Sequence, residues 1–349
     1  ASMSVRTGRE CFRALSMPEA VTLASGVYRV RASVPSRSKA TADMVQTDEA
    51  FWTIFSFHFL SGEAFTKADC DAGLTRAVLD ATTARRLFGT TDAVGHTVQL
   101  DYVDYTVAGV VADVSMLATA AYAQIWVPYT AAGAEAMSWQ NDTMGPMHAI
   151  ILARSSADFD AIREETELLR KKYNDGLQDV EVFYRGQPDT QLAYLYRRWY
   201  AEPDVPGVML RYAIVVIILL LVPAVNLSGM TLSRMRRRMA EIGVRKAFGA
   251  TGGELMRQVF FENLVLTLLA GIVGLALSYV ATFALNGFLF SNSMNASLSG
   301  ETALTPGMLL SPWAFIAAFA FCLLMNILSA GIPAWRASRM NITDAINQR

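Results

Sequence analysis

The side chains with the clearest recognition chemistry lie in one short basic segment, residues 234–250. A charged pair, Glu241 and Arg245, falls on a short predicted helical stretch that glycines end. Such a stretch can dock in a groove of a partner protein, with Ile242 or Phe248 as its apolar anchor. A basic anchor beside anionic lipid, or a surface helix with only a structural role, are simpler alternatives. The candidate contact residues are Arg238, Glu241, Ile242, Gly243, Arg245, Lys246, Phe248 and Gly249.

Elsewhere the sequence offers little that suits catalysis. It contains no phosphate-binding loop of the form G-x-x-x-x-G-K-[ST], so we do not expect this chain to hydrolyse ATP. His58, His96 and His148 are too scattered to form a recognisable ligand pattern. Acid pairs such as Asp69 and Asp71 suit turns and helix caps better than acid–base chemistry. We therefore expect no catalytic residue, no metal site and no cofactor on this chain.

Long uncharged stretches on both sides of the basic segment predict helices that cross a membrane. Residues 212–232 carry no charge, and a helix of this length spans a hydrocarbon core of about 30 Å. Two further spans are expected at about 264–285 and 313–332. Buried helices of a soluble enzyme are rarely so long and so free of charge. The predicted fold class is a transmembrane α-helical bundle, with three spans visible, joined to a large α/β domain.

The distribution of charge predicts which side of the membrane each part faces. Residues 234–257 hold seven basic and two acidic side chains, whereas the loop between the last two spans carries only Glu301. Basic loops stay in the cytoplasm, so this segment is predicted to be cytoplasmic. Residues 1–206 carry a net charge of −7 and residues 207–349 a net charge of +6. We expect the acidic N-terminal region to lie on the opposite side of the membrane.

The N-terminal region, residues 1–206, is predicted to form one large mixed α/β domain, and residues 207–349 the membrane domain. A short aromatic helix is expected to end at Phe55, and Gly89 is expected to end a helix at 80–88. Further helices are expected at 157–173 and 190–200. Strands are expected at 21–24, 27–32, 97–100, 105–111, 124–127, 148–152 and 180–184.

Small and polar residues within the spans predict helix packing. Pro223 kinks its helix, and the Asn226 amide is expected to lie against a neighbouring helix; a substrate path is the alternative. A stripe in the second visible span consists of Ala270, Gly271, Gly274 and Ser278. It allows close approach of another helix, either of this chain or of a second copy.

Three cysteines occur, of which Cys322 lies in the last span. Cys11 and Cys70 both fall in the region predicted outside the cytoplasm, where a disulfide is chemically permitted. Two cysteines are too few to form a disulfide framework in a domain of this size. The sequence leaves open whether they pair.

Several motifs resemble one transporter family. Residues 239–251, M-A-E-I-G-V-R-K-A-F-G-A-T, resemble the signature of ABC transporter permeases of the MacB/FtsX/LolC-LolE family. The run 332–346 is similar to the family's ending, except that Asn341 and Ile342 stand where a proline often follows. The N-terminal region resembles a MacB-like periplasmic core in F-H-F-L-S-G-E-A-F (57–65), A-R-R-L-F-G (84–89) and Y-T-V-A-G-V-V-A-D-V (105–114).

The resemblance implies a multi-pass protein of the bacterial inner membrane with four spans and a large periplasmic domain between the first two. A span ahead of Ala1 is therefore expected. It also implies a homodimer or related heterodimer that binds two copies of a cytosolic ATPase, which would carry the ATP and Mg²⁺. The alternative of an ATPase fused ahead of this region, as in MacB, stays open.

The resemblance further implies a function. Residues 234–257 would contain the coupling helix that contacts the ATPase, and closure of the ATPase pair would move the periplasmic domains, a process called mechanotransmission. The exported or extracted substrate would be a drug, peptide, lipid or lipoprotein, as in efflux or lipoprotein release. The alternative is an FtsX-like scaffold that activates a cell-wall hydrolase, and a receptor without an ATPase is a third. Other partners could be a periplasmic adaptor or an outer-membrane channel.

Overall fold

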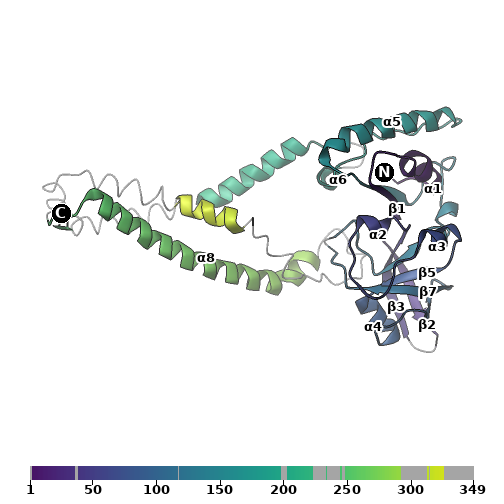
Figure 1. Ribbon diagram of the computed structural model, residues 1–349, viewed down its shortest axis with the longest axis horizontal. Helices are drawn as coiled ribbons and strands as arrows, with labels where there is room; N and C mark the ends of the chain where they lie inside the picture. Colours follow the sequence, from purple (N-terminus) through teal and green to yellow (C-terminus); the bar gives the residue numbers. More distant parts are fainter. Residues whose placement is uncertain are drawn as a thin grey trace. The chain divides into compact units, whose positions relative to one another are not determined.

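The fold was analysed in a computed structural model, which describes residues 2–35, 38–116, 118–197, 203–222, 233, 244–245, 248–291, 313 and 315–325. The chain divides into two compact units, whose main boundary lies between Pro203 and Asp204. The N-terminal unit holds all the strands that the structure describes and most of the short helices (Figure 1). The C-terminal unit holds long apolar helices.

A strongly curved sheet forms the larger part of the N-terminal unit. Its strands run in the order β4-β7-β5-β8-β3-β2-β6. β6 pairs with β7 as well as with β2, so six of the strands close into a ring and β4 is added at the outside of β7. The strands are β2 (Tyr28–Val34), β3 (Ser38–Thr47), β4 (Phe59–Gly62), β5 (Arg76–Asp80), β6 (Thr97–Leu100), β7 (Val103–Val111) and β8 (Ile125–Pro128).

The ring encloses an apolar core because its strands alternate between buried and exposed side chains. In β7, Tyr105 and Val107 are buried, whereas Asp104 of the same strand is exposed. Helix α4 (Ala81–Phe88) packs into the same core through Leu87 and Phe88. Its end at Gly89, which has φ +81°, confirms the predicted stop.

A smaller lobe packs beside the ring in the same unit. It is built on a two-stranded antiparallel sheet of β1 (Ala20–Ser25) and β9 (Met147–Leu152). The helix α5 (Phe159–Asp175) covers it with a buried stripe of Ile162, Thr166 and Tyr173. The N-terminal residues fold onto the same lobe as α1 (Val5–Gly8) and the short π-helix η1 (Arg9–Arg13).

The remaining elements of the N-terminal unit are short. Two of them begin with a capping box, at Thr66 before α3 and at Ser155 before η3. They are α2 (Phe51–Ile54), α3 (Lys67–Asp71), η2 (Ala134–Ala136), η3 (Ser156–Asp158) and α6 (Gln191–Tyr196).

The buried carboxylate of Asp48 ties the two lobes together. Its Oδ2 accepts hydrogen bonds from Arg13 Nη1 in η1 (2.6 Å) and from the Leu23 backbone N–H in β1 (3.0 Å). Its Oδ1 accepts from Thr22 Oγ1 (2.7 Å) and the Ala50 N–H (3.1 Å). Burial raises the pKa of Asp48, and the positive charge of Arg13 acts in the opposite direction.

The structure corrects one strand prediction. Residues 180–184 form no strand, because the backbone of Val182 is already paired with a side chain. Asn174 Oδ1 accepts from the Val182 N–H (3.0 Å), and Asn174 Nδ2 donates to the Val182 carbonyl (3.0 Å). Tyr184 nevertheless enters the core of the small lobe.

The two cysteines of the N-terminal unit are separate thiols. Cys11 is buried in the core of the small lobe, together with Phe12 and Met147. Cys70 is buried in a different cluster, around Trp126 and Phe65. Cys11 and Cys70 therefore form no disulfide, a question that the sequence left open.

Within its described residues, the C-terminal unit has two helices that are long and apolar enough to cross a membrane. They contain Val205–Val222, with mean hydropathy 2.5, and Leu264–Ala281, with mean hydropathy 2.3. The second is part of α8 (Gly252–Ser291), an unbroken helix of 40 residues. A third, shorter apolar helix, Phe315–Met325, covers part of the last predicted span. Residues 326–332 of that span lie outside the described residues.

Candidate coupling segment and membrane helices

Several predicted site residues lie outside the part of the chain that the structure describes. From the coupling segment these are Arg238, Glu241, Ile242, Gly243 and Lys246, and from the first visible span Pro223 and Asn226. The structure describes the other coupling candidates, Arg245, Phe248 and Gly249. It also describes all four residues of the small-residue stripe.

The described coupling residues form a turn that leads directly into α8. The Phe248 N–H donates to the Val244 carbonyl (3.1 Å), and the Ala250 N–H donates to the Arg245 carbonyl (3.1 Å). Gly249 has φ +94°, the left-handed conformation in which helices commonly end. One helical turn therefore closes at Gly249.

The first turn of α8 is fixed by a capping box that starts just after this glycine. The Glu254 N–H donates to Thr251 Oγ1 (3.3 Å), and the Thr251 N–H donates to Glu254 Oε2 (3.0 Å). The hydrogen bond from the Thr251 backbone lowers the pKa of Glu254. A carboxylate at this position also interacts favourably with the positive end of the helix dipole.

Arg245 links the turn to α8 across a shallow hollow. Its Nη1 donates to Gln258 Oε1 over 2.8 Å. The hollow has a volume of about 470 Å³ and is lined by Arg245, Phe248, Gly249, Ala250, Glu254 and Gln258. The Phe248 side chain is 90% exposed at its rim. An aromatic side chain that is almost wholly exposed, on a turn held by hydrogen bonds, is suited to enter a pocket of a partner.

The sequence predicted that Arg245, Phe248 and Gly249 belong to one contact segment, but it did not predict the residues that fix the start of α8 and bind Arg245. Thr251 and Glu254 were detectable, because T-x-x-E before an apolar run is the signature of a capping box. Gln258 carried no comparable signal. Its role depends on the turn that brings Arg245 back to α8.

The predicted stripe of small residues in α8 is divided between two faces of the helix. Gly271 lies on the packed face, where a Cβ atom would come within 3.2 Å of Phe319 Cδ2. Gly274 has no neighbouring atom within 4 Å of that position, and Ala270 and Ser278 are also exposed. The Ser278 hydroxyl donates to the Leu275 carbonyl of its own helix (2.9 Å). Only Gly271 therefore serves helix packing inside the described part of the chain.

Phe319 belongs to an aromatic pair on the short apolar helix. Its ring stacks with that of Phe315, with ring centroids 6.3 Å apart and an angle of 20° between the planes. The missing Cβ at Gly271 lets the Phe319 ring approach the backbone of α8.

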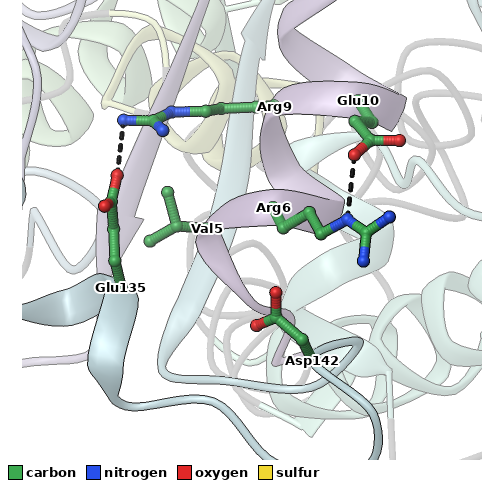
Figure 2. Close-up of a pocket in the computed structure, with 6 residues that line it drawn as sticks. All are labelled: Val5, Arg6, Arg9, Glu10, Glu135 and Asp142. Carbon is green, nitrogen blue, oxygen red and sulfur yellow. Dashed lines mark hydrogen bonds and ion pairs between the residues drawn. The ribbon is translucent and has the colours of Figure 1, made fainter.

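The N-terminal unit has a polar hollow on its small lobe (Figure 2). Its volume is about 290 Å³, and it is lined by Val5, Arg6, Arg9, Glu10, Glu135 and Asp142. Arg6 pairs with Glu10 (3.0 Å) and Arg9 with Glu135 (2.7 Å), so both guanidinium groups already hold a carboxylate. Among the described residues, no group of three or more His, Cys, Asp or Glu side chains could hold a metal ion.

Two protein families match consecutive parts of this chain. Residues 2–169 match the MacB-like periplasmic core domain, and residues 213–342 match the FtsX-like permease C-terminal domain. The chain belongs to the MacB/FtsX family of ABC transporter permeases. The turn at Gly249, the start of α8 and the Gly271 contact all lie within the match to the permease domain.

Curated relatives of this permease include macrolide export ATP-binding/permease proteins named MacB. The Escherichia coli K12 protein is 26% identical over 314 residues, covering 88% of this chain and 43% of its own length. The Chromobacterium violaceum protein is 25% identical over 307 residues, covering 87% and 43%. The chain thus spans less than half the length of the curated relatives it matches.

Solved structures similar to part of this chain include two transporter domains. The periplasmic region of MacB from Actinobacillus actinomycetemcomitans has a TM-score of 0.40 and 18% identity, over 50% of this chain and 76% of that one. The extracellular domain of the ABC-type transporter YknZ has a TM-score of 0.38 and 18% identity, over 49% and 84%.

Proposed function

We propose that this permease couples ATP hydrolysis by a cytosolic ATPase to movement of a periplasmic domain. The turn Arg245–Gly249 would be the contact with the ATPase, and Phe248 its apolar anchor. The observation that carries this proposal is the exposed Phe248 ring on a hydrogen-bonded turn that continues into α8. Aromatic side chains and arginine, such as Phe248 and Arg245, are enriched in protein interfaces.

The continuity of α8 supports a mechanical role. The helix begins three residues after Gly249 and runs unbroken for 40 residues, about 60 Å at the usual rise per residue. This exceeds a hydrocarbon core of about 30 Å. In the proposed orientation, a displacement of the cytoplasmic turn reaches the other side of the membrane through one rigid element, without a channel for substrate.

ATP and Mg²⁺ would bind to the ATPase and not to this chain, which would hold no cofactor and perform no catalysis. The ATPase would be a separate subunit present in two copies, although the relatives are named ATP-binding/permease proteins. The permease would work as a homodimer or related heterodimer in the bacterial inner membrane. Its substrate would be a drug, peptide, lipid or lipoprotein that is exported or extracted.

A regulatory role is the second candidate, and the match of the C-terminal region to an FtsX-like permease domain favours it. In that case the same coupling turn would act, but the periplasmic domain would activate a cell-wall hydrolase and move no substrate. The two functions share the ATPase contact and differ in the partner outside the membrane.

The test is affinity purification of the tagged full-length protein from its native membranes, with mass spectrometry and an ATPase assay. We compare the wild type with Phe248→Asp, and with Phe183→Asp as a matched control at an exposed Phe of the N-terminal unit. The proposal expects an ATPase with the wild type and the control, and its loss with Phe248→Asp. If no ATPase is recovered with any variant, the coupling function is wrong. A co-purified hydrolase without transport activity would favour the regulatory role.

A further inference from the structure

The helix α6 exposes an apolar face that the proposed function leaves unexplained. Leu192, Tyr194 and Leu195 are 44%, 58% and 61% exposed. At 100° per residue these three lie on the side of the helix opposite Ala193, which is the buried residue. Three neighbouring large apolar side chains on one exposed face indicate a surface that another apolar phase covers.

This face is held in a fixed position on the N-terminal unit. Thr190 caps α6, since its Oγ1 accepts from the Ala193 N–H over 3.2 Å. At the other end, Arg197 Nη2 donates to Asp189 Oδ1 (2.7 Å) and Arg197 Nε donates to Asp189 Oδ2. Both partners of this bidentate ion pair are nearly buried. The exposed face is therefore a built surface and not a frayed end of the chain.

The length of the following chain indicates what covers this face. Seven residues join Arg197 to Val205, where the first apolar helix begins, and such a linker reaches about 28 Å at most. Asp204 caps that helix, because its Oδ1 accepts from the Gly207 N–H over 3.0 Å. The helix has mean hydropathy 2.5 and none of its apolar window is buried by protein, so lipid is its natural surrounding. The face on α6 is thus tethered close to the point where the chain enters the membrane.

The residue types around α6 match the boundary between lipid and water. Tyrosine, tryptophan and long basic side chains are enriched at that boundary, where a ring or aliphatic stem is apolar and its tip is polar. The sequence from Tyr194 to Tyr200 reads Y-L-Y-R-R-W-Y. Residues 198–200 lie outside the described residues and contribute here by type alone.

We propose that the Leu192–Tyr194–Leu195 face of α6 is a membrane-surface anchor that inserts into the headgroup region of the outer leaflet. The proposal rests on the membrane placement that forms part of the proposed function. Anchoring fixes the base of the N-terminal unit at the lipid surface while the coupling turn receives the ATPase on the other side. A second copy of this chain is the competing occupant of the same face.

The test measures the depth of single spin labels in the full-length protein, reconstituted into vesicles of phosphatidylethanolamine and phosphatidylglycerol at a ratio of about 3:1. Cys322→Ala removes the exposed native thiol, whereas Cys11 and Cys70 are buried. Burial raises the pKa of Cys70 to about 12, which keeps its thiol unreactive. Labels are placed by Leu195→Cys in α6, by Leu168→Cys in α5 as a control of the same type and similar exposure, and by Leu219→Cys in the apolar helix.

The readout is the ratio of label accessibility to oxygen, which concentrates in lipid, over that to a water-soluble nickel chelate. We expect the ratio at position 195 to lie between a low value at 168 and a high value at 219, and Leu192→Glu to shift it towards the value at 168. A ratio at 195 equal to that at 168 would overturn the anchor. Low accessibility of the label at 195 to both reagents would also overturn the anchor if its spectrum showed spin–spin broadening. Broadening that disappears on dilution with unlabelled protein would show that a second copy of the chain covers this face.

The failure of the underlying function has a different signature. A ratio at position 219 as low as that of a label in water would show that this helix does not span the membrane, and the anchor proposal would fail with it. If no ATPase is recovered with any variant but the ratio at 195 is intermediate, the coupling function is wrong and the anchor proposal is still supported.

Discussion

Arg13 Nη1 lies 2.6 Å from Asp48 Oδ2, and this ion pair joins the N-terminal π-helix η1 to the segment that follows β3. Arg13 Nη2 also contacts Glu49 Oε1 (2.9 Å), so one guanidinium holds two consecutive acids. Asp48 is 1% exposed. The small lobe and the closed sheet of the N-terminal unit therefore share an ion pair whose carboxylate is buried and whose guanidinium is partly exposed.

Replacing Arg13 by Met should destabilise the N-terminal unit by about 3 kcal/mol, because it leaves a buried carboxylate without its cation. Arg13→Lys keeps the charge but loses the two-pronged geometry, and should fall between Met and the wild type. Chemical denaturation followed by fluorescence measures the change. Arg6→Ala is the control, since Arg6 and Glu10 form an exposed pair and should contribute little (Figure 2). Equal effects of Arg13→Met and Arg6→Ala would contradict this reading.

Asp80 should make the stability of the N-terminal unit depend on pH. Burial raises its pKa to about 6 from an ordinary value of 3.8. The folded protein thus binds this proton more tightly than the unfolded chain. The stabilisation is fully present below pH 3.8 and is lost as the pH rises through about 6.

The substitution Asp80→Asn removes this titration and keeps an N-cap for α4, where Asp80 Oδ1 accepts from the Thr83 N–H over 2.8 Å. The difference in Tm between Asp80→Asn and the wild type should therefore change between pH 4 and pH 7, in favour of the variant at pH 7. Because all other titrating groups are the same in both proteins, a difference independent of pH would show that Asp80 titrates normally.

Gly271 and Gly274 should respond differently to the same substitution. Gly271→Leu would push side-chain atoms into Phe319 and separate α8 from the short apolar helix, whereas a Cβ atom at position 274 meets nothing within 4 Å. Cross-linking between cysteines introduced in the two helices, in reconstituted bilayers, measures the separation. We expect a strong loss with Gly271→Leu and little change with Gly274→Leu; equal loss would place the packed face elsewhere.

Thr251→Val should loosen the first turn of α8, because valine cannot accept the hydrogen bond from the Glu254 N–H. Hydrogen exchange should become faster at residues 252–256 and stay unchanged around residue 275. Thr267→Val, a substitution of the same kind within α8, serves as the control. Equal protection of the first turn in both variants would show that the capping box contributes nothing.

Local signals in the sequence predicted much of this molecule. The apolar helices follow from hydropathy and length, and α4 with its stop at Gly89 follows from a cap and a glycine. The closure of the sheet could not be predicted, because it depends on Ala32 of β2 meeting Leu100 of β6 across 68 residues of chain. No local pattern specifies such a register.

The missed strand β3 shows a different limit. Its sequence S-K-A-T-A-D-M-V-Q-T places Asp43 and Gln46 inside the protein, so it lacks the apolar pattern of a buried strand. One polar atom of each side chain has a partner from another element: Tyr122 donates to Asp43 Oδ2 (2.8 Å), and Gln46 Nε2 donates to the Tyr28 hydroxyl. The periodicity of apolar residues within a strand cannot reveal hydrogen-bond partners that lie so far away in the sequence.

The closed ring of strands also limits how other molecules can recognise the N-terminal unit. A sheet that closes on itself leaves no row of unpaired backbone N–H and C=O groups within the ring, so an extended peptide cannot join it as an extra strand. In this sheet, as far as the structure describes it, β4 is the strand with a single neighbour, and it is only four residues long. A partner that binds to the closed ring must therefore recognise its side chains and turns, because the ring offers no free strand edge to which a peptide could add.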